Sequence, residues 1–246
     1  MSYTKIEDIR QQRLQKKRQQ RLATLMGVSG VILVVVLLLW LPSIIDNMRP
    51  AGEFTQITPQ SYPLADGRAF GDPNATVVVE VFSDFQCSAC KNFALTTEAQ
   101  LFATEYFQNG QVNYISRQFP FMDNTSAIKA SDQAANASMC AAEQNRFWDY
   151  HSILFANQNT SNATAFSDRR LVAFAESLGL DMKVFNRCFE ANAYAADIQM
   201  DIDRGALLNV TGTPTVFING AKIGVGNMVP SYDDIIAAIE TALSLQ

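Results

Sequence analysis

The sequence predicts an α/β domain in which a small mixed β-sheet is interrupted by a helical insertion, preceded by a transmembrane helix. Two observations lead to this prediction. In the C-terminal part of the chain, the expected elements follow the order strand, helix, strand, several helices, two strands and a helix. Nearer the N-terminus, residues 22–45 carry no charge, and as a helix they would extend about 36 Å, enough to cross a bilayer.

Residues 1–21 are predicted to be a cytoplasmic segment. They hold seven basic and two acidic residues, and positive charge beside an apolar span marks the cytoplasmic side. A cleaved secretory signal is the alternative, but its apolar region is usually about 7–15 residues long and ends at a small-residue cleavage site. No such site follows Trp40. We therefore expect residues 22–45 to be a single-pass anchor in the cytoplasmic membrane, with the remainder periplasmic or extracellular.

The exported part of the chain is acidic. The formal charge is −5 overall and +5 over residues 1–21, which leaves −10 for the remainder. Because nucleic-acid binding needs a basic face, a nucleic-acid partner is not expected. The chain has a single histidine, which excludes a site of several histidines, and we expect neither a metal nor another cofactor.

A linker of low regularity is predicted at residues 46–69, where prolines and glycines are scattered without a helical or alternating pattern. The folded domain is then expected over residues 70–246. Residues 75–82 are a β-branched, mostly apolar run that fits a strand covered on both faces. A helix over residues 87–107 and an alternating strand over residues 111–118 follow.

The predicted helical insertion runs from about residue 125 to residue 207, where no convincing strand pattern occurs. Its helices are expected at residues 131–144, 147–155, 168–178, 182–190 and 194–207. Strands are predicted again at residues 214–218 and 221–225, joined by Asn219-Gly220 as a type I′ turn. A final amphipathic helix is expected over residues 231–245.

Cys87 and Cys90 form a Cys-Ser-Ala-Cys pair where the first strand passes into the following helix. Such pairs occur in metal sites, structural disulfides and dithiol redox enzymes. A thiol in the first turn of a helix faces unpaired N–H groups and the positive end of the helix dipole, which stabilise its thiolate. Cys90 lies one turn deeper on the same face and can resolve a mixed disulfide. This placement favours redox catalysis.

Three segments together resemble the DsbA-like branch of the thioredoxin superfamily. They are Phe82-Ser-Asp-Phe-Gln-Cys-Ser-Ala-Cys90, Thr211-Gly-Thr-Pro-Thr-Val-Phe-Ile-Asn-Gly220, and the insertion segment Cys140-Ala-Ala-Glu-Gln-Asn-Arg-Phe-Trp-Asp-Tyr-His151. The resemblance covers about residues 70–245 and implies a thioredoxin-like fold and protein thiol:disulfide oxidoreductase activity. It also implies that Pro214 is a cis proline against the active-site pair, with the Thr213 backbone presented to an extended substrate. From the sequence alone, a trans proline that opens a strand fits equally well.

Glu80 is the candidate for the buried carboxylate that, in this superfamily, moves a proton to or from Cys90. Burial would raise the pKa of this carboxyl towards neutrality, while a surface-facing glutamate is the alternative. Cys140 and Cys188 fall on apolar faces of predicted helices and could form a structural disulfide in an oxidising compartment. Two buried free thiols are the alternative there.

The expected function is disulfide exchange with exported proteins, as a dithiol oxidase that a membrane redox partner reoxidises, as the resemblance implies. Ser88 and Ala89 stand where relatives often have proline followed by histidine or tyrosine, which leaves the direction of electron flow open. A reductase or isomerase would use the same residues. A non-catalytic module that binds a partner protein or Cu(I) through the two thiolates is the alternative from another class.

Overall fold

A computed structural model describes most of the C-terminal part of the chain and a smaller share of the N-terminal part. The described residues are 16, 18, 26, 27, 29, 30, 32–41, 51–125, 129–159, 164–226 and 228–245. The chain divides into two compact units, Met1–Pro50 and Ala51–Gln246. Each unit is described by itself.

In the first unit, the described residues between positions 26 and 41 are helical. The rest of the predicted anchor, residues 22–25, 28, 31 and 42–45, lies outside the described residues, as does most of the predicted basic segment. Among the described residues, no helix has both the length and the apolar character that a membrane crossing requires.

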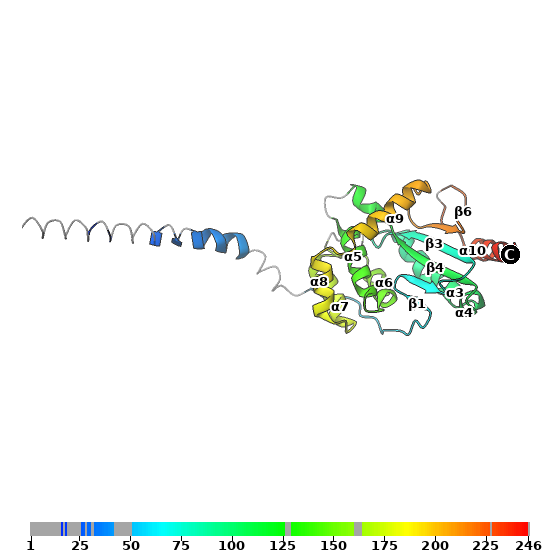
Figure 1. Ribbon diagram of the computed structural model, residues 1–246, viewed down its shortest axis with the longest axis horizontal. Helices are drawn as coiled ribbons and strands as arrows, with labels where there is room; N and C mark the ends of the chain where they lie inside the picture. The colour runs from blue at the N-terminus through cyan, green and yellow to red at the C-terminus, as the bar shows by residue number, and fades with distance from the viewer. Residues whose placement is uncertain are drawn as a thin grey trace, which may run out of the picture. The chain divides into compact units, whose positions relative to one another are not determined.

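The second unit is built on a mixed six-stranded sheet with the order β1-β2-β4-β3-β5-β6. Figure 1 shows β3 and β4 side by side within it. The strands are β1 (Ala65–Asp66), β2 (Ala69–Gly71), β3 (Val77–Ser83), β4 (Val112–Gln118), β5 (Thr215–Ile218) and β6 (Ala221–Ile223). Only β3 and β4 pair in parallel among these six strands. β3 is central and mostly buried, because its β-branched run is covered on both faces. The prediction of a mixed sheet is confirmed.

The first two strands fall at the end of the predicted linker, where the sequence shows no strand pattern. Both are short, and β2 pairs with β4 through Gly71, which has φ 116°. A Cβ atom at Gly71 would lie 2.2 Å from the Val112 carbonyl oxygen. Glycine is therefore required for this close approach of two backbones.

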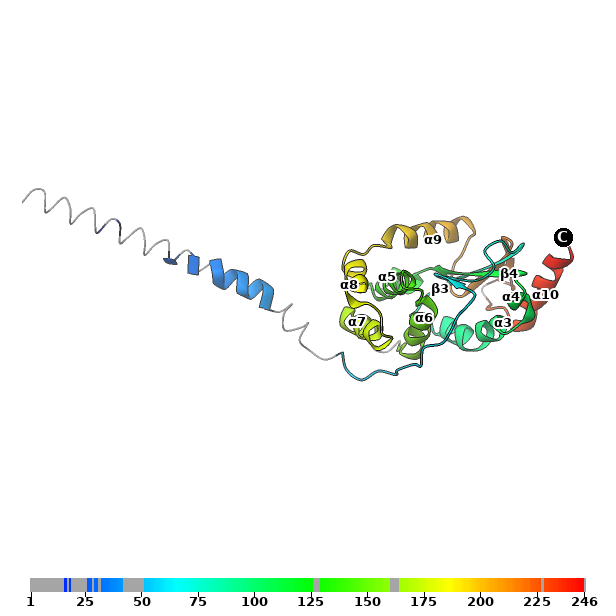
Figure 2. The ribbon, with the colours of Figure 1, turned by 60° about the horizontal axis from the view of Figure 1, so that its bottom comes forward.

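Helices cover both faces of the sheet. The segment after β3 contains α2 (Ser88–Phe93), the π-helix η1 (Ala94–Glu98), α3 (Ala99–Phe102) and α4 (Glu105–Gln108), so the single helix expected there is divided. α3 and α10 (Tyr232–Ser244) pack on one face and α9 (Ala195–Leu207) on the other, as Figure 2 shows. A capping box between Ser231 and Asp234 starts α10.

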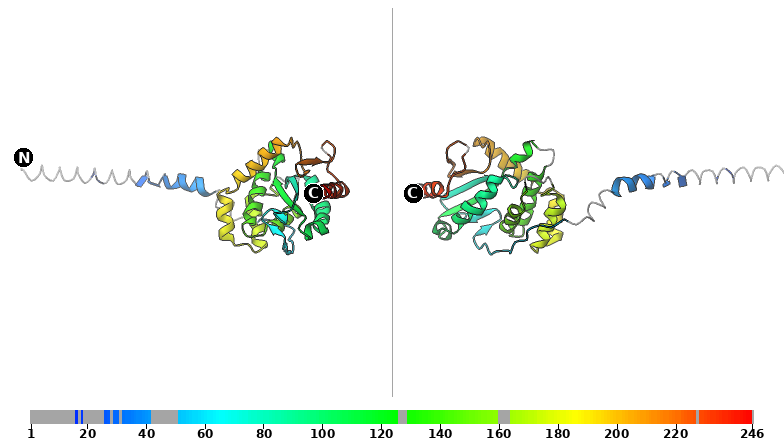
Figure 3. Two further views of the ribbon diagram at one scale, coloured as in Figure 1. Left: turned by 45° about the vertical axis from the view of Figure 1, so that its right-hand side comes forward. Right: turned by 180° about the vertical axis from the view of Figure 1, so that it is seen from behind.

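The helical insertion gathers beside the sheet, in the green to yellow part of Figure 3. It comprises the short 3-10 helix η2 (Phe121–Thr125), α5 (Ala130–Ala142), α6 (Phe147–Ala156), α7 (Asp168–Ser177) and α8 (Met182–Glu190), and it leads into α9. These helices enclose their own apolar core. Within it a disulfide joins Cys140 of α5 to Cys188 of α8, which is the first of the two arrangements considered for this pair.

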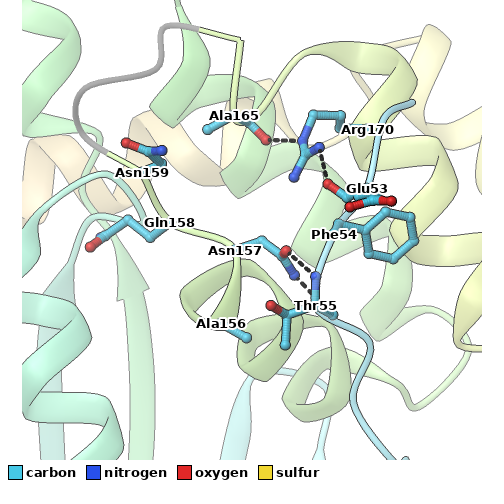
Figure 4. A pocket seen from close by; sticks show the side chains of 9 residues that line it. All are labelled: Glu53, Phe54, Thr55, Ala156, Asn157, Gln158, Asn159, Ala165 and Arg170. Atoms are coloured by element: carbon cyan, nitrogen blue, oxygen red, sulfur yellow. Dashed lines mark hydrogen bonds between the residues drawn. The ribbon is translucent and has the colours of Figure 1, made fainter. Parts of the chain in front are cut away.

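The beginning of the second unit, residues 51–60, packs against the insertion, and we call it the strap. Arg170 of α7 donates a hydrogen bond to the Glu53 carbonyl (3.1 Å). The Asn157 side chain accepts from the Thr55 N–H (2.7 Å) and donates to the Thr55 carbonyl (2.8 Å), as drawn in Figure 4. The sequence predicts an irregular linker here from its scattered prolines and glycines. Local pattern does not reveal these contacts, because the partners lie about a hundred residues away in the chain.

Candidate active site

Cys87 lies at the N-terminus of α2, directly after the turn that follows β3. It is the N-cap residue, with the extended backbone angles φ −78° and ψ 121°. Its N–H donates to the Asp84 carbonyl (3.0 Å), and its own carbonyl accepts the first helical hydrogen bond from the Lys91 N–H (3.1 Å). The side chain is only partly buried, so a substrate sulfur can approach it.

The Cys87 sulfur is held as a thiolate. The hydrogen bond from the Cys90 thiol is the largest of the effects that lower the pKa of Cys87, to about 5. The Thr213 side chain and the backbone amides of Cys90 and Ala89 lower it further, while partial burial opposes them. The thiolate is the nucleophilic form of cysteine and also a good leaving group, so Cys87 is suited to both halves of an exchange reaction at neutral pH.

Cys90 is fully buried, whereas Cys87 is only partly buried. Cys90 is only 1% exposed, and burial, together with the neighbouring Cys87 sulfur, raises its pKa well above the ordinary value. The Asp84 N–H donates to its sulfur (3.4 Å). Neither cysteine is disulfide-bonded in this structure. The geometry therefore corresponds to the reduced state, with one partly exposed thiolate and one buried thiol.

The loop before β5 meets Cys87 from far away in the sequence. The Thr213–Pro214 peptide bond is cis, the conformation that the resemblance implies. The Cys87 sulfur lies 3.2 Å from the Thr213 carbonyl oxygen, to which its thiol form donates. This approach follows from the sheet, because β5 is antiparallel to β3 and pairs Thr215 with Phe82. The start of β5 is thereby placed beside the end of β3 that leads to Cys87.

Asp84 organises the active-site turn and is not among the predicted site residues. Its carboxylate accepts hydrogen bonds from the N–H groups of Gln86 (2.7 Å) and Met122 (2.8 Å) and from the Ser131 hydroxyl (2.7 Å). Burial raises the pKa of this carboxyl to about 6 although these hydrogen bonds oppose the rise. The signal was present in the sequence, since an aspartate three positions before Cys87 can cap the turn that leads to the helix.

Glu80 is buried, as predicted, and not surface-facing. Burial alone would raise the pKa of its carboxyl, but hydrogen bonds and charges from Arg204 and Arg117 together lower it. Arg117 lies 2.6 Å away, and Arg204 pairs with the other oxygen. The predicted rise in the pKa of Glu80 is therefore wrong.

The pleat of β3 explains this result. Val79 and Val81 share an apolar core with Phe93 of α2, and successive residues of a strand point to opposite faces. Glu80 consequently points away from that core, toward the face that α9 covers through Arg204. Counting positions back from Cys87 does not reveal which face of the sheet a residue occupies.

Another buried carboxylate lies on the same side of the sheet as α2. Glu98, at the end of η1, is 5% exposed, and burial raises its pKa to about 8. The Tyr114 hydroxyl donates to it (2.5 Å). His151 lies 3.5 Å away, but burial lowers the pKa of this imidazole to about 3, so the histidine is neutral. Within the described ranges, no three His, Cys, Asp or Glu side chains are grouped so that they could hold a metal ion.

Comparisons with known proteins agree with this geometry. Residues 64–241 match the family model described as thioredoxin. The chain is 24% identical over 229 residues to the probable disulfide bond formation protein D of Bacillus anthracis, covering 92% of this chain and 99% of that protein. It is 26% identical over 179 residues to disulfide bond formation protein D of Bacillus subtilis, covering 70% and 75%. Oxidised BdbD from Bacillus subtilis superposes with a TM-score of 0.62 at 22% identity, covering 78% of this chain and 100% of that one.

Proposed function

The chain belongs to the thioredoxin family and is a thiol:disulfide oxidoreductase, and from this premise we propose that it oxidises the dithiols of exported proteins through Cys87 and Cys90. The observation that carries the proposal is the contrast between the two sulfurs. Cys87 is accessible and its pKa is lowered to about 5, whereas Cys90 is buried and its pKa is raised. One sulfur thus meets the substrate, and the other completes the exchange.

The reaction starts from the Cys87–Cys90 disulfide. A substrate thiolate attacks the Cys87 sulfur and forms a mixed disulfide, the bond between the two enzyme sulfurs breaks, and its electron pair leaves on Cys90, which takes up a proton. The second substrate thiolate then attacks the substrate sulfur of the mixed disulfide and releases Cys87 as a thiolate. The substrate loses two electrons and the enzyme pair gains them.

The low pKa of Cys87 favours this direction. A sulfur that is stable as a thiolate is a good leaving group, and stabilising the reduced form of a pair makes its disulfide more oxidising. Neither Ser88 nor Ala89 provides an imidazole. The thiolate is stabilised instead by the Cys90 thiol, by Thr213 and by the helix amides. The Cys-Ser-Ala-Cys sequence is therefore compatible with an oxidase.

The Thr213 backbone is the proposed docking site for the substrate. Its carbonyl lies beside the Cys87 sulfur, in the partly buried loop that leads into β5. An extended peptide that pairs with this backbone would bring its own cysteine to Cys87 without any requirement on its side chains. Such recognition suits an enzyme that acts on many exported proteins.

We also propose that the enzyme is tethered to the outer face of the cytoplasmic membrane. The support is the uncharged stretch of residues 22–45 after the basic residues 1–21. A membrane redox partner would then reoxidise the Cys87–Cys90 pair close to the bilayer. Alkaline carbonate extraction of membranes tests the tether, and labelling of Cys87 in intact cells by an impermeant maleimide tests the side. Recovery of the full-length chain in the soluble fraction would contradict the tether.

The activity is tested by two assays with the same protein, reoxidation of reduced RNase and reduction of insulin, with Cys87→Ser as the control. The proposal expects the purified disulfide form to restore RNase activity stoichiometrically without a cofactor, and Cys87→Ser to be inactive. Insulin reduction without RNase reoxidation would assign a reductase. Absence of both activities from folded protein would remove the proposed reaction.

A further inference from the structure

The carboxamide of Gln158 connects the helical insertion to the active-site backbone. Gln158 follows α6, and its Nε2 atom donates to the carbonyl of Phe85 (2.7 Å) and to the carbonyl of Cys87 (2.8 Å). The two carbonyls lie on either side of Gln86. One side chain, 71 positions after Cys87, thus binds two carbonyl groups of the turn that leads into α2.

These hydrogen bonds act at the residue whose conformation decides where the reactive sulfur lies. Cys87 is the N-cap of α2, and the amides of Ala89 and Cys90 stabilise its thiolate only while the sulfur faces them. The Cys87 carbonyl already accepts the Lys91 N–H, so Gln158 uses its second lone pair. A rotation of the Cys87 peptide would break the hydrogen bond from Gln158 and turn the sulfur away from the helix.

Gln158 is itself held in place by its neighbour. Asn157 donates to the Ile153 carbonyl (2.9 Å) and exchanges two hydrogen bonds with Thr55 of the strap. In Figure 4 the side chains of Asn157 and Gln158 extend to opposite sides of the chain, the first towards the strap. The strap and α6 therefore fix the backbone at Asn157. This positions the side chain of the next residue, Gln158, to contact the active-site turn.

We propose that Gln158 is a positioning residue for disulfide exchange, which holds Cys87 in the N-cap conformation where the helix amides face its sulfur. This inference rests on the proposed function, because it concerns the sulfur that meets the substrate. Gln158 does not touch the reacting atoms and acts through the Cys87 backbone. Its loss should change the ionisation of the sulfur, which a purely structural role would leave unaltered.

The test compares two glutamines whose side chains each make two hydrogen bonds to backbone groups of a distant segment. Gln158→Met removes the donor at similar length. Gln144→Met is the matched control, because the Gln144 carboxamide bridges to the backbone of Asp181 in a half-buried position that does not contact Cys87. The pKa of Cys87 is measured on the dithiol forms from the pH dependence of iodoacetamide alkylation and from thiolate absorbance. Urea unfolding of the disulfide forms reports stability.

For Gln158→Met, alkylation at pH 5 should slow about two- to fivefold, which corresponds to a pKa rise of about half a unit to one unit. Gln144→Met should keep the wild-type profile while losing comparable stability. If Gln158→Met does not fold, Gln158→Asn, which keeps the donor but shortens its reach, should give a smaller rise. A folded Gln158 variant with the wild-type profile overturns the inference alone. A wild-type Cys87 with an ordinary pKa would instead overturn the proposed function.

Discussion

The hydrogen bond from the Cys90 thiol is the largest cause of the lowered pKa of Cys87, and Cys90→Ala removes it. A hydrogen bond to a charged group is worth about 1.5–3 kcal/mol, which corresponds to about one to two pKa units. We therefore expect the pKa of Cys87 to rise from about 5 to about 6–7. At pH 5 the thiolate fraction, and with it the alkylation rate, should fall about five- to fiftyfold.

Iodoacetamide alkylation between pH 4 and pH 8 measures this change directly. In Cys90→Ala, Cys87 is the only free thiol, because Cys140 and Cys188 are bonded to each other. Cys90→Ser is the matched control, since its hydroxyl keeps a donor at the same position. Its profile should stay close to that of the wild type.

A midpoint near pH 5 in Cys90→Ala would refute this expectation, since the helix amides and Thr213 would then suffice to stabilise the thiolate. Identical titration of the serine and alanine variants would refute it as well, because the donor at position 90 would then have no effect.

Three further outcomes follow from buried groups. For Glu98, the pKa is raised to about 8 in the folded state. The stability it contributes is therefore complete below about pH 4.5 and is lost, by up to about 1.4 kcal/mol per pH unit, as the pH rises towards 8. Glu98→Gln should abolish this slope in urea unfolding. Replacing Cys140 and Cys188 by alanine should cost about 4 kcal/mol in unfolding free energy, because their bond closes a loop of 48 residues. Glu80→Gln should cost about 1–3 kcal/mol, because Arg117 and Arg204 both lose a charged hydrogen-bond acceptor while Arg117 keeps its ion pair with Asp201. It should leave the pH profile of Cys87 alkylation unchanged.

Each outcome has a result that contradicts it. Parallel pH curves for the wild type and Glu98→Gln would show that this carboxyl ionises normally. An unchanged unfolding midpoint after loss of the Cys140–Cys188 bond would show that breaking the bond adds little conformational entropy to the denatured chain. A shifted pH profile of Cys87 alkylation in Glu80→Gln would instead support a proton-transfer role for Glu80.

The sequence predicts those parts of the structure that local pattern determines. The β-branched run before Cys87 forms β3, and the predicted helix at residues 182–190 has the same bounds as α8. There Asp181 caps the helix by accepting from the N–H groups of Lys183 and Val184. The placement of Cys87 at a helix start also follows from the order of elements alone.

The remainder depends on contacts between distant segments. Nothing near Glu80 in the sequence shows that Arg117 and Arg204 will surround it, and so its charged state could not be derived. Gln158 lies just after a predicted helix and Glu98 lies within one, and only tertiary packing brings Gln158 to the Cys87 carbonyl and Glu98 to the Tyr114 hydroxyl. The cis conformation at Pro214 is likewise set by tertiary structure.

The strap is recognised almost entirely by its main chain. The groups that bind Arg170, Asn157 and Asp149 are carbonyls and N–H groups, which every non-proline residue offers. The exceptions are Phe54, whose ring packs edge-on against Phe174, and Ile57, which packs against the core of the insertion. Most other strap side chains can therefore be exchanged without loss of the strap's contacts, so that grafting a different leader onto this domain requires these two apolar residues to be retained.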